Sequence, residues 1–470
     1  MSRKQGVKYG FPHVFVILLI IMAFAMAATW FVPAGQYSRH FDQQAHKTVI
    51  EPESFEYVEG APVDPFQMFV AIQKGLTQAG SIVFFIFIVF SSIYLVMNTG
   101  AIDASIAWMV RKTRAKPRSA NITFIILMAV FMIWGSTGTL SYEEMIAFVP
   151  IFASLALAMG YDTVVGLAVS FVSVGIGFAS ATLNPFTIGV AQTISELPLF
   201  SGIGYRLLIL LVMGGITIWW TLRYAAKVKA DPSKSVVGDM DFGDLEFDEA
   251  KIDLEMTAAH KRTLVIFLVA VIIAGYGLLR LHWYINQLAG LFIIMGILIG
   301  AANGYGPSRI AELYVQGMGK GVLSATIVGV ARGILVILSE GKIVDTLIHG
   351  MAGVLGQGSL YISSVGMLIF QTFMNFLIPS GSGQAATTMP IMAPISDLVG
   401  LNRQIAVLAF QFGDGFSNLL WPTGFILIGC VLAGIPYNKY LRWFLPLFGI
   451  LFIVQVLFLW GAVAINYGPF

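Results

Sequence analysis

Two short segments rich in glycine and hydroxyl residues interrupt apolar stretches of this sequence. They are Gly135-Ser136-Thr137-Gly138-Thr139 and Ser380-Gly381-Ser382-Gly383-Gln384, and a proline follows each in a similar setting, Pro150 and Pro394. Polar backbone is costly in lipid unless it is buried in protein or lines a wet cavity. Paired interruptions in two halves of a chain are typical of transporter binding sites, although small residues can instead serve close helix packing. The predicted substrate-binding residues of these segments are Ser136, Thr137, Gly138, Thr139, Ser380, Gly381, Ser382, Gly383 and Gln384.

Charged side chains inside or beside apolar runs form the second candidate group. Arg332 lies in the middle of one run, and Glu143, Glu144 and Asp414 lie in or next to others. A charge within a membrane is costly, is usually paired and is functional by default. Arg332 could bind a substrate carboxylate, or it could pair with Glu340 or with one of the other three acids. We predict that Glu143 and Asp414 hold a substrate ammonium group, a coupling cation or a proton. Opposite charges in one membrane core favour an amino acid over a dicarboxylate.

Two further apolar runs are broken by asparagine and proline, at Asn184-Pro185 and at Asn418 ahead of Pro422. Proline frees a backbone carbonyl, and carbonyl, amide and hydroxyl oxygens suit a hard cation such as sodium. A plain proline kink is the alternative. Asn184 and Asn418 are also candidate substrate ligands. The residues predicted to surround a coupling cation, with sodium and a proton as alternatives, are Glu144, Asn184, Thr187, Ser417 and Thr423.

The composition places these features in a membrane. Hydrophobic residues make up 57% of the chain and charged residues only 11%, against about 25% charged residues in soluble domains. The apolar runs exceed the ~10-residue strands of membrane barrels, so we predict an all-α polytopic membrane protein. The first run, Val14 to Val32, is too long for a signal peptide and is predicted to be retained. Basic residues concentrate in one set of loops, which places the N-terminus in the cytoplasm. The net charge of +2 does not indicate a nucleic-acid partner.

The order of the runs predicts two repeats of inverted topology, each with a re-entrant hairpin and a broken transmembrane helix. Ser136 stands opposite Ser380, and a serine precedes a proline by five residues in both broken spans, at Ser180 and Ser417. The predicted division is a first repeat at 1–224, with an extracytoplasmic loop at 36–65 and a hairpin at 119–160; a cytoplasmic linker at 225–262; a connecting transmembrane helix at 263–283; and a second, inverted repeat at 284–470, with a hairpin at 359–400.

The same residues resemble the YfcC-type branch of the C4-dicarboxylate anaerobic carrier family, within the ion-transporter superfamily. The most specific segments run from Pro379 to Pro394 and from Ala409 to Asn418, and Phe11-Pro12, Trp30 to Tyr37 and Ala331-Arg332-Gly333-Ile334 also fit. The resemblance covers nearly the whole length. It implies a bacterial inner-membrane secondary transporter with two re-entrant hairpins, which forms a homodimer and works by an elevator motion. Family members are described as carriers of C4-dicarboxylates or as exchangers of basic amino acids such as arginine and ornithine.

We therefore predict a secondary active transporter that moves a basic amino acid, by exchange, through elevator-type alternating access. A carrier of C4-dicarboxylates or other small carboxylates, coupled to Na+ or H+, is the main alternative. A channel and an intramembrane hydrolase are remote alternatives. A serine hydrolase needs a base positioned near its nucleophile, and no local motif joins His13 or His349 to Ser382. We expect no enzymatic activity and no cofactor apart from the coupling ion.

Overall fold

The computed structural model describes residues 14–42, 47–51, 53–115, 118–146, 148–245, 253–281, 283, 285–355 and 359–469. The N-terminal basic residues and Phe11-Pro12 lie outside these ranges. Most of the described chain is helical, and eight helices are long and apolar enough to cross a membrane. The prediction of a helical, multi-pass membrane protein is therefore confirmed, while the cytoplasmic N-terminus stays a prediction.

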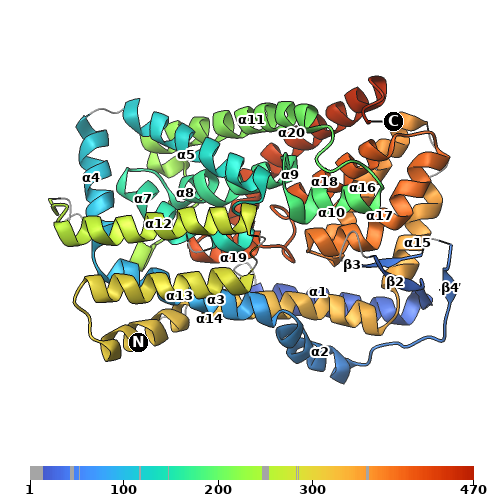
Figure 1. Cartoon of the computed structure of the whole chain (residues 1–470), viewed down its shortest axis with the longest axis horizontal. Helices are drawn as coiled ribbons and strands as arrows, with labels where there is room; N and C mark the ends of the chain where they lie inside the picture. Colours follow the sequence, from blue (N-terminus) through green and yellow to red (C-terminus); the bar gives the residue numbers. More distant parts are fainter. Residues whose placement is uncertain are drawn as a thin grey trace, which may run out of the picture.

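Five helices form a lower layer, which lies along the bottom of Figure 1. Small residues let these helices approach closely, as expected in a membrane. A Cβ atom added to Gly317 would lie 2.5 Å from the Cα atom of Ser91. The Ser91 hydroxyl donates to the Tyr314 carbonyl at 2.7 Å, and Ser92 donates to the Phe292 carbonyl at 2.8 Å. The helices of the lower layer are α1 (Val14–Phe31), α2 (Pro65–Gln78), α3 (Gly80–Asn98), α13 (Ile285–Ala302) and α14 (Pro307–Glu340).

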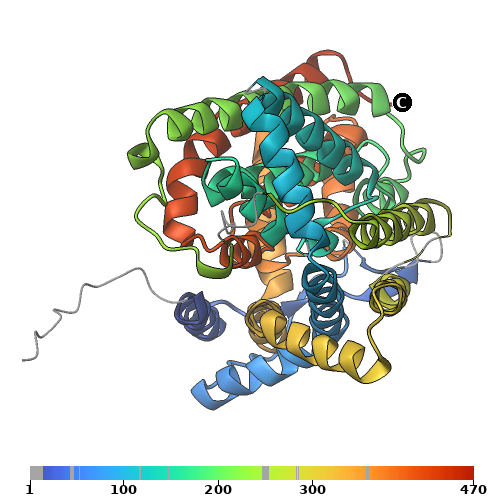
Figure 2. The same ribbon diagram turned by 90° about the vertical axis from the view of Figure 1, so that its left-hand side faces the viewer.

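An upper layer contains both hairpins and both broken spans, and Figure 2 shows it above the blue and gold helices of the lower layer. The first broken span is wholly buried at its centre. Its elements are the α-helices α8 (Thr163–Leu167), α9 (Ser173–Ser180) and α10 (Val190–Ile194) and the π-helices η1 (Ala168–Val172) and η2 (Pro185–Gly189). The remaining elements of the layer are α5 (Arg118–Thr137), α6 (Tyr142–Met145), α7 (Val149–Ala158), α11 (Ile203–Ala230), α16 (Leu360–Leu377), α17 (Gly381–Leu398), α18 (Arg403–Ser417), α19 (Ile426–Leu432) and α20 (Tyr437–Ala464).

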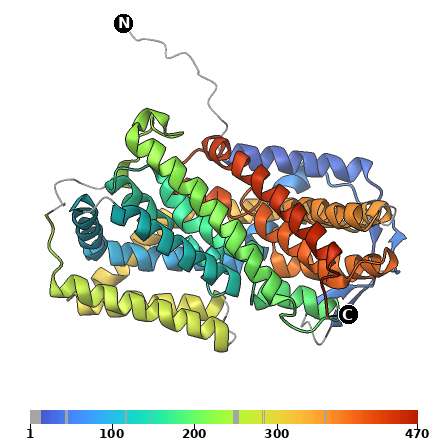
Figure 3. The same cartoon turned by 90° about the horizontal axis from the view of Figure 1, so that it is seen from above.

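Three helices complete the membrane part: α4 (Ala101–Ala115), α12 (Ala258–Arg280) and α15 (Val344–Leu355). Helix α12 runs along one side of the molecule, where most of its surface is exposed (Figure 3). It falls close to the connecting helix predicted at 263–283. Part of the predicted linker is packed against the preceding helices, because Ser235 donates to the Asp162 carboxylate at 2.5 Å, as does Tyr224 of α11. Two short 3-10 helices, η3 (Pro232–Lys234) and η4 (Gly243–Leu245), lie in that linker.

The predicted loop at 36–65 contains four short strands, which we call the β-arm. Strand β1 (Gly35–Gln36) pairs antiparallel with β4 (Glu56–Tyr57), and β2 (Arg39–Asp42) pairs antiparallel with β3 (Lys47–Ile50). The β-arm is fixed to α15 by hydrogen bonds across more than half of the sequence, described below. The division into two inverted repeats, with its boundaries, stays a prediction.

Candidate functional site

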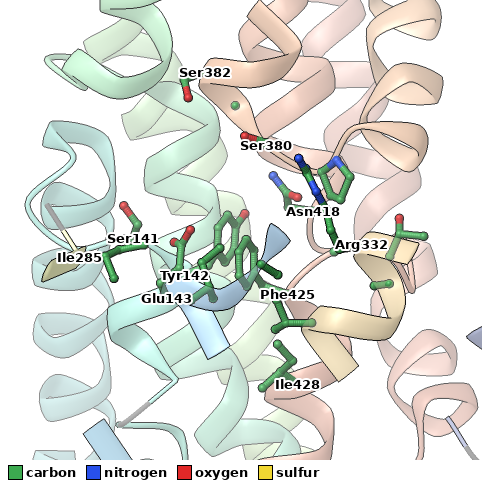
Figure 4. A pocket seen from close by; sticks show the side chains of 18 of the residues that line it. Ser141, Tyr142, Glu143, Ile285, Arg332, Ser380, Ser382, Asn418, Phe425 and Ile428 are labelled. Carbon is green, nitrogen blue, oxygen red and sulfur yellow. The ribbon is translucent and has the colours of Figure 1, made fainter. Parts of the chain in front are cut away.

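A cavity of about 260 Å³ lies between the two layers, next to residues of both hairpins. The lower layer contributes one wall, from α2, α3, α13 and α14. The upper layer contributes the opposite wall, from both hairpins and both broken spans. Figure 4 shows Glu143 on one side of this space and Arg332, Asn418 and Ser380 on the other. The lower-layer lining is Gln78, Ala79, Ile82, Ile285, Ile327, Val328, Ala331 and Arg332; the upper-layer lining is Ser141, Tyr142, Glu143, Glu144, Phe178, Phe186, Thr187, Pro379, Ser380, Gly381, Ser382, Asn418, Thr423, Gly424, Phe425 and Ile428.

The first hairpin presents an acidic turn to this cavity. Helix α6 starts after Ser141 with a capping box, in which the Glu144 carboxylate accepts the Ser141 amide at 2.7 Å. This bond fixes Glu144 as a capping group. Glu143 lies on the same turn and lines the cavity, and no other residue in the described ranges donates a hydrogen bond to its carboxylate. Glu143 is therefore the acid of this hairpin that is free to bind a cationic group.

The turn is held in place by Tyr142, a residue that the sequence did not single out. Its hydroxyl donates to the Gly415 carbonyl at 2.8 Å, and its ring is parallel to that of Phe425 at 5.9 Å between centroids. The ring is almost fully buried. The signal in the sequence was an amphipathic aromatic residue beside two acids in an apolar run. Tyr142 thus ties the acidic turn to both parts of the second broken span.

The second hairpin presents a helix N-terminus instead of an acid. Ser380 is the N-cap of α17 in extended conformation, and its side chain makes no capping hydrogen bond. The first amides of a helix have no intrahelical acceptor, and they form the positive end of the helix dipole. Ser380, Gly381 and Ser382 all line the cavity. An uncapped N-terminus of a helix of 18 residues is suited to a carboxylate.

Arg332 on α14 adds a full positive charge on the same side of the cavity as that N-terminus. Its Nε donates to the Gln78 side-chain oxygen at 3.3 Å. The Glu340 carboxylate, one of the partners considered from the sequence, is instead bound by Lys74 at 2.6 Å. No acid in the described part of the chain forms an ion pair with Arg332. The guanidinium therefore has capacity left for an anionic ligand.

Asp414 does not line the cavity but lies directly behind it. It is fully buried, and neither of its carboxylate oxygens has a hydrogen-bond donor among the described residues. A Cβ atom added to Gly381 would lie 2.9 Å from Asp414 Oδ2 and 2.6 Å from Thr187 Cγ2, so these three residues meet. The Thr187 hydroxyl and the Asn418 side-chain oxygen are also buried without a partner in the described ranges. One carboxylate and two neutral oxygens left unpaired are a donor set that suits a small hard cation.

The first glycine-rich tip is placed away from this cavity. The Ser136 hydroxyl is buried and lies 3.0 Å from that of Thr182, and Gly138 packs against the Asn184 side chain. Thr137 and Thr139 line a separate apolar cavity of about 370 Å³ beside α12 and α13. The tip lies away from the cavity because α5 ends at Thr137, where Gly138 adopts a left-handed φ of 72°. The chain changes direction there, and α6 begins only at Tyr142.

Several other predicted residues are occupied by internal hydrogen bonds. Gln384 donates to the Gln371 side chain at 2.7 Å, and Ser417 accepts from Asn375 at 2.8 Å. The Asn184 side-chain oxygen accepts the Phe186 amide at 2.9 Å, and Thr423 donates to the Phe376 carbonyl at 2.9 Å. Gly383 lines a second cavity, on the far side of Ser380. Among the residues predicted to surround a coupling cation, Thr187 is the one that meets Asp414 at Gly381 and whose buried hydroxyl has no partner in the described ranges.

Arg206 has a structural role that the sequence did not reveal. It is fully buried, and it donates to the carbonyls of Ala181 at 3.0 Å and Thr182 at 3.3 Å, where α9 ends. It also donates to the Ser201 carbonyl at 2.6 Å. A buried arginine here satisfies the carbonyls that the break in the first broken span leaves free. The second broken span has no equivalent arginine within the residues that the structure describes.

The chain is similar to known proteins along nearly its whole length. The profile of the C4-dicarboxylate anaerobic carrier family matches residues 11–464. A relative in Escherichia coli K12, named "Putative basic amino acid antiporter YfcC", is 31% identical, over 99% of this chain and 99% of its own. An uncharacterized protein of Haemophilus influenzae is 28% identical, over 96% of this chain and 97% of its own. A solved structure of the Alcanivorax borkumensis YdaH transporter has a TM-score of 0.45 at 14% identity, over 97% of this chain and 100% of that chain.

The family match covers almost the entire described chain, and the relative in Escherichia coli is matched from end to end. Both are consistent with a transporter rather than an enzyme. The chain belongs to the C4-dicarboxylate anaerobic carrier family.

Proposed function

We propose that this protein is a secondary active transporter of an amino acid, with basic amino acids as the preferred substrates and exchange as the mode of transport. The observation that carries the proposal is the separation of charge across the cavity. Glu143 offers a carboxylate from the first hairpin, while Arg332 and the N-terminus of α17 offer positive charge from the other side. A zwitterion uses both ends, with its ammonium group at Glu143 and its carboxylate at α17 and Arg332. The name of the relative in Escherichia coli points to the same class of substrate.

The coupling or counter-transported cation would be held behind the substrate, by Asp414, Thr187 and Asn418. Their unpaired buried oxygens fit a sodium ion, and the Asp414 carboxylate alone fits a proton. A bound cation would neutralise the Asp414 carboxylate. Because Gly381 separates Asp414 from the cavity, neutralising that carboxylate makes the first turn of α17 more favourable for an anionic group. A cation bound at Asp414 would thus raise the affinity of the first turn of α17 for the substrate's carboxylate.

Alternating access would arise from movement of the upper layer against the lower layer. The cavity lies between the layers, and its two walls come from different layers. We propose an elevator motion, in which the two hairpins carry the substrate while α14 stays in place. The proposal includes a homodimer in the bacterial inner membrane, with the N-terminus in the cytoplasm, as the resemblance to the family and the distribution of basic residues suggest.

A C4-dicarboxylate is the second candidate substrate, because one observation favours it. Arg332 and the α17 N-terminus are two positive elements on the same side of the cavity, and both suit carboxylates. In this case Glu143 would face the second carboxylate, which requires a proton or cation between them. The amino acid is preferred because it needs no such addition.

Uptake into proteoliposomes separates the two candidates. Labelled arginine, ornithine, lysine, aspartate and succinate are offered with and without sodium at fixed pH, and each unlabelled compound is then used as competitor. We expect saturable uptake of a basic amino acid that increases when the vesicles are loaded with another. Glu59→Gln, an exposed glutamate, serves as the control variant. Saturable succinate transport without competition from any amino acid would contradict the proposal.

A further inference from the structure

A second cavity of about 470 Å³ adjoins the candidate site on the side of the β-arm. It is lined by the β-arm, by one face of α14, by the start of α15 and by the second hairpin. We call it the vestibule. Arg332 and Ser380 line both the vestibule and the candidate site, so the two spaces meet at these residues. The lining of the vestibule is Gly35, Gln36, Arg39, Arg332, Leu335, Ser339, Lys342, Val344, Asp345, Ile378, Ser380, Gly383 and Thr387.

The charges of the vestibule are unbalanced. Arg39 is neutralised, because its Nη2 lies 2.8 and 2.9 Å from the two carboxylate oxygens of Asp345. Asp345 is 4% exposed and also accepts the Tyr37 amide at 3.0 Å. Lys342 has no ion-pair partner for its ammonium group among the described residues, and Arg332 binds only the Gln78 amide oxygen. Two positive charges therefore remain without counter-charge in one concave space.

The walls around these charges are joined by hydrogen bonds and ring stacking. The β-arm is joined to α15 and to the turn before it, since Gly35 donates to the Lys342 carbonyl at 2.9 Å and Thr346 donates to the Pro33 carbonyl at 2.7 Å. The His349 ring stacks on Phe55 at 3.9 Å between centroids. Lys342 itself has a left-handed φ of 55°, which these contacts hold in place. A concave surface with an excess of one sign of charge concentrates ions of the opposite sign.

We infer that the vestibule is a binding site for the substrate's carboxylate group on its way to the candidate site. The carboxylate first meets Lys342, then Arg332, and then the amides at the start of α17. A substrate enters with its carboxylate foremost, and its ammonium group follows toward Glu143. This inference rests on the proposed transport of a substrate that carries a carboxylate. Lys342 and Arg332 thus guide the substrate's carboxylate into the candidate site from the side of the β-arm.

Cysteine chemistry tests the charge of the vestibule without any transport assay. The sole native cysteine, Cys430, is buried, so an added cysteine is the reactive one. Ser339→Cys places a thiol in the vestibule at an exposed position, and Ser233→Cys places one at an exposed position in the linker. In purified protein the rates of modification by an anionic and by a cationic methanethiosulfonate are compared. We expect Ser339→Cys to prefer the anionic reagent about tenfold more than Ser233→Cys does, since focused potentials change local ion concentrations by that order.

The added variant Lys342→Gln should remove most of that preference, whereas Lys227→Gln, at the end of α11, should leave it unchanged. Equal preferences at the two cysteines, or no change with Lys342→Gln, would overturn the inference.

The second experiment measures how far ligands protect Ser339→Cys from modification. Succinate, aspartate and arginine should each slow modification of Ser339→Cys, while agmatine, which lacks a carboxylate, should not. Protection by agmatine equal to that by arginine, or protection by none of the four, would overturn carboxylate binding here. Because this readout needs no transport, it can succeed even where the amino-acid uptake proposed above fails.

Discussion

The two hairpins occupy comparable positions beside one cavity, yet their ends differ in almost every physical respect. In the first hairpin the polar groups of the tip are satisfied internally. Gly138 ends α5, the Ser136 hydroxyl is hydrogen-bonded to that of Thr182, and a capping box satisfies amides at the start of α6. The second hairpin leaves its tip open, with α17 uncapped after Ser380. The first therefore offers a carboxylate, and the second offers backbone amides. Two hairpins with similar sequence patterns thus present unlike groups to one cavity.

This difference explains how a substrate is oriented. A symmetric pair of tips would present the same groups twice and would suit a symmetric ligand. An acidic end facing a helix N-terminus and an arginine suits a ligand with an ammonium group and a carboxylate. The two adjacent acids of the first hairpin also have different roles, because Glu143 faces the cavity while Glu144 caps α6. The following variants test these differences, in order of expected effect.

Removing the acid of the first hairpin should have the largest effect. Glu143→Gln should lower uptake of the transported amino acid about 100-fold, because loss of one partner from a desolvated charge pair costs about 2–5 kcal/mol. Initial rates in proteoliposomes measure the change, with Glu59→Gln as control. If Glu143→Gln transported at the rate of the control, the acidic end of the site would lie elsewhere.

Filling the open end of the second hairpin should have the next largest effect. Gly381→Ala would bring a methyl group within 2.6 Å of Thr187 and 2.9 Å of Asp414. Overpacking of this kind costs about 1–3 kcal/mol, so we expect uptake to fall about tenfold and its sodium or proton dependence to change. Gly204→Ala, which has open space around it, is the matched control. Equal activity of the two variants would contradict the close contact of α17 with Asp414.

Two variants of Glu144 test whether this acid caps α6 rather than binding the substrate. Glu144→Ala should lower the stability of the protein by about 1 kcal/mol through loss of the cap, whereas Glu144→Gln keeps an acceptor and should stay near the native value. Thermal unfolding in detergent compares the two. A collapse of transport with Glu144→Gln, as severe as that of Glu143→Gln, would show that the two acids do not have separate roles.

The smallest effect is expected at the tip of the first hairpin. Ser136→Ala removes the hydrogen bonds of its hydroxyl to the Ile133 carbonyl and to Thr182, each worth about 0.5–1.5 kcal/mol of stability, and should leave KM unchanged. Ser382→Ala, in the open tip, should raise KM several-fold while stability is kept, since a ligand hydrogen bond is worth a similar amount. The pair is compared by uptake kinetics and thermal unfolding. A raised KM for Ser136→Ala with none for Ser382→Ala would reverse the comparison.

Local patterns in the sequence were sufficient to predict the helical membrane fold, the interrupted helices and the charged candidates. Arg332, Glu143, Ser380 and Asn418 do come together around one cavity. The burial of Ser136 away from the cavity could not be predicted, because it depends on where a left-handed glycine ends α5, whereas Glu143 on the same hairpin was among the predicted residues. The ion pair between Lys74 and Glu340 depends on residues 266 positions apart. Such contacts are set by tertiary packing and leave no trace in local composition.

We propose that the substrate's ammonium group binds at Glu143 and its carboxylate at Arg332 and the N-terminus of α17. The most direct test is competition against the best transported amino acid by its deaminated and its decarboxylated analogues, in the native protein and in Glu143→Gln. In the native protein both analogues should compete more weakly than the amino acid. In Glu143→Gln the amino acid and its deaminated analogue should compete equally, while the decarboxylated analogue should remain weaker. A disadvantage of the deaminated analogue that is equally large in both proteins would contradict the account.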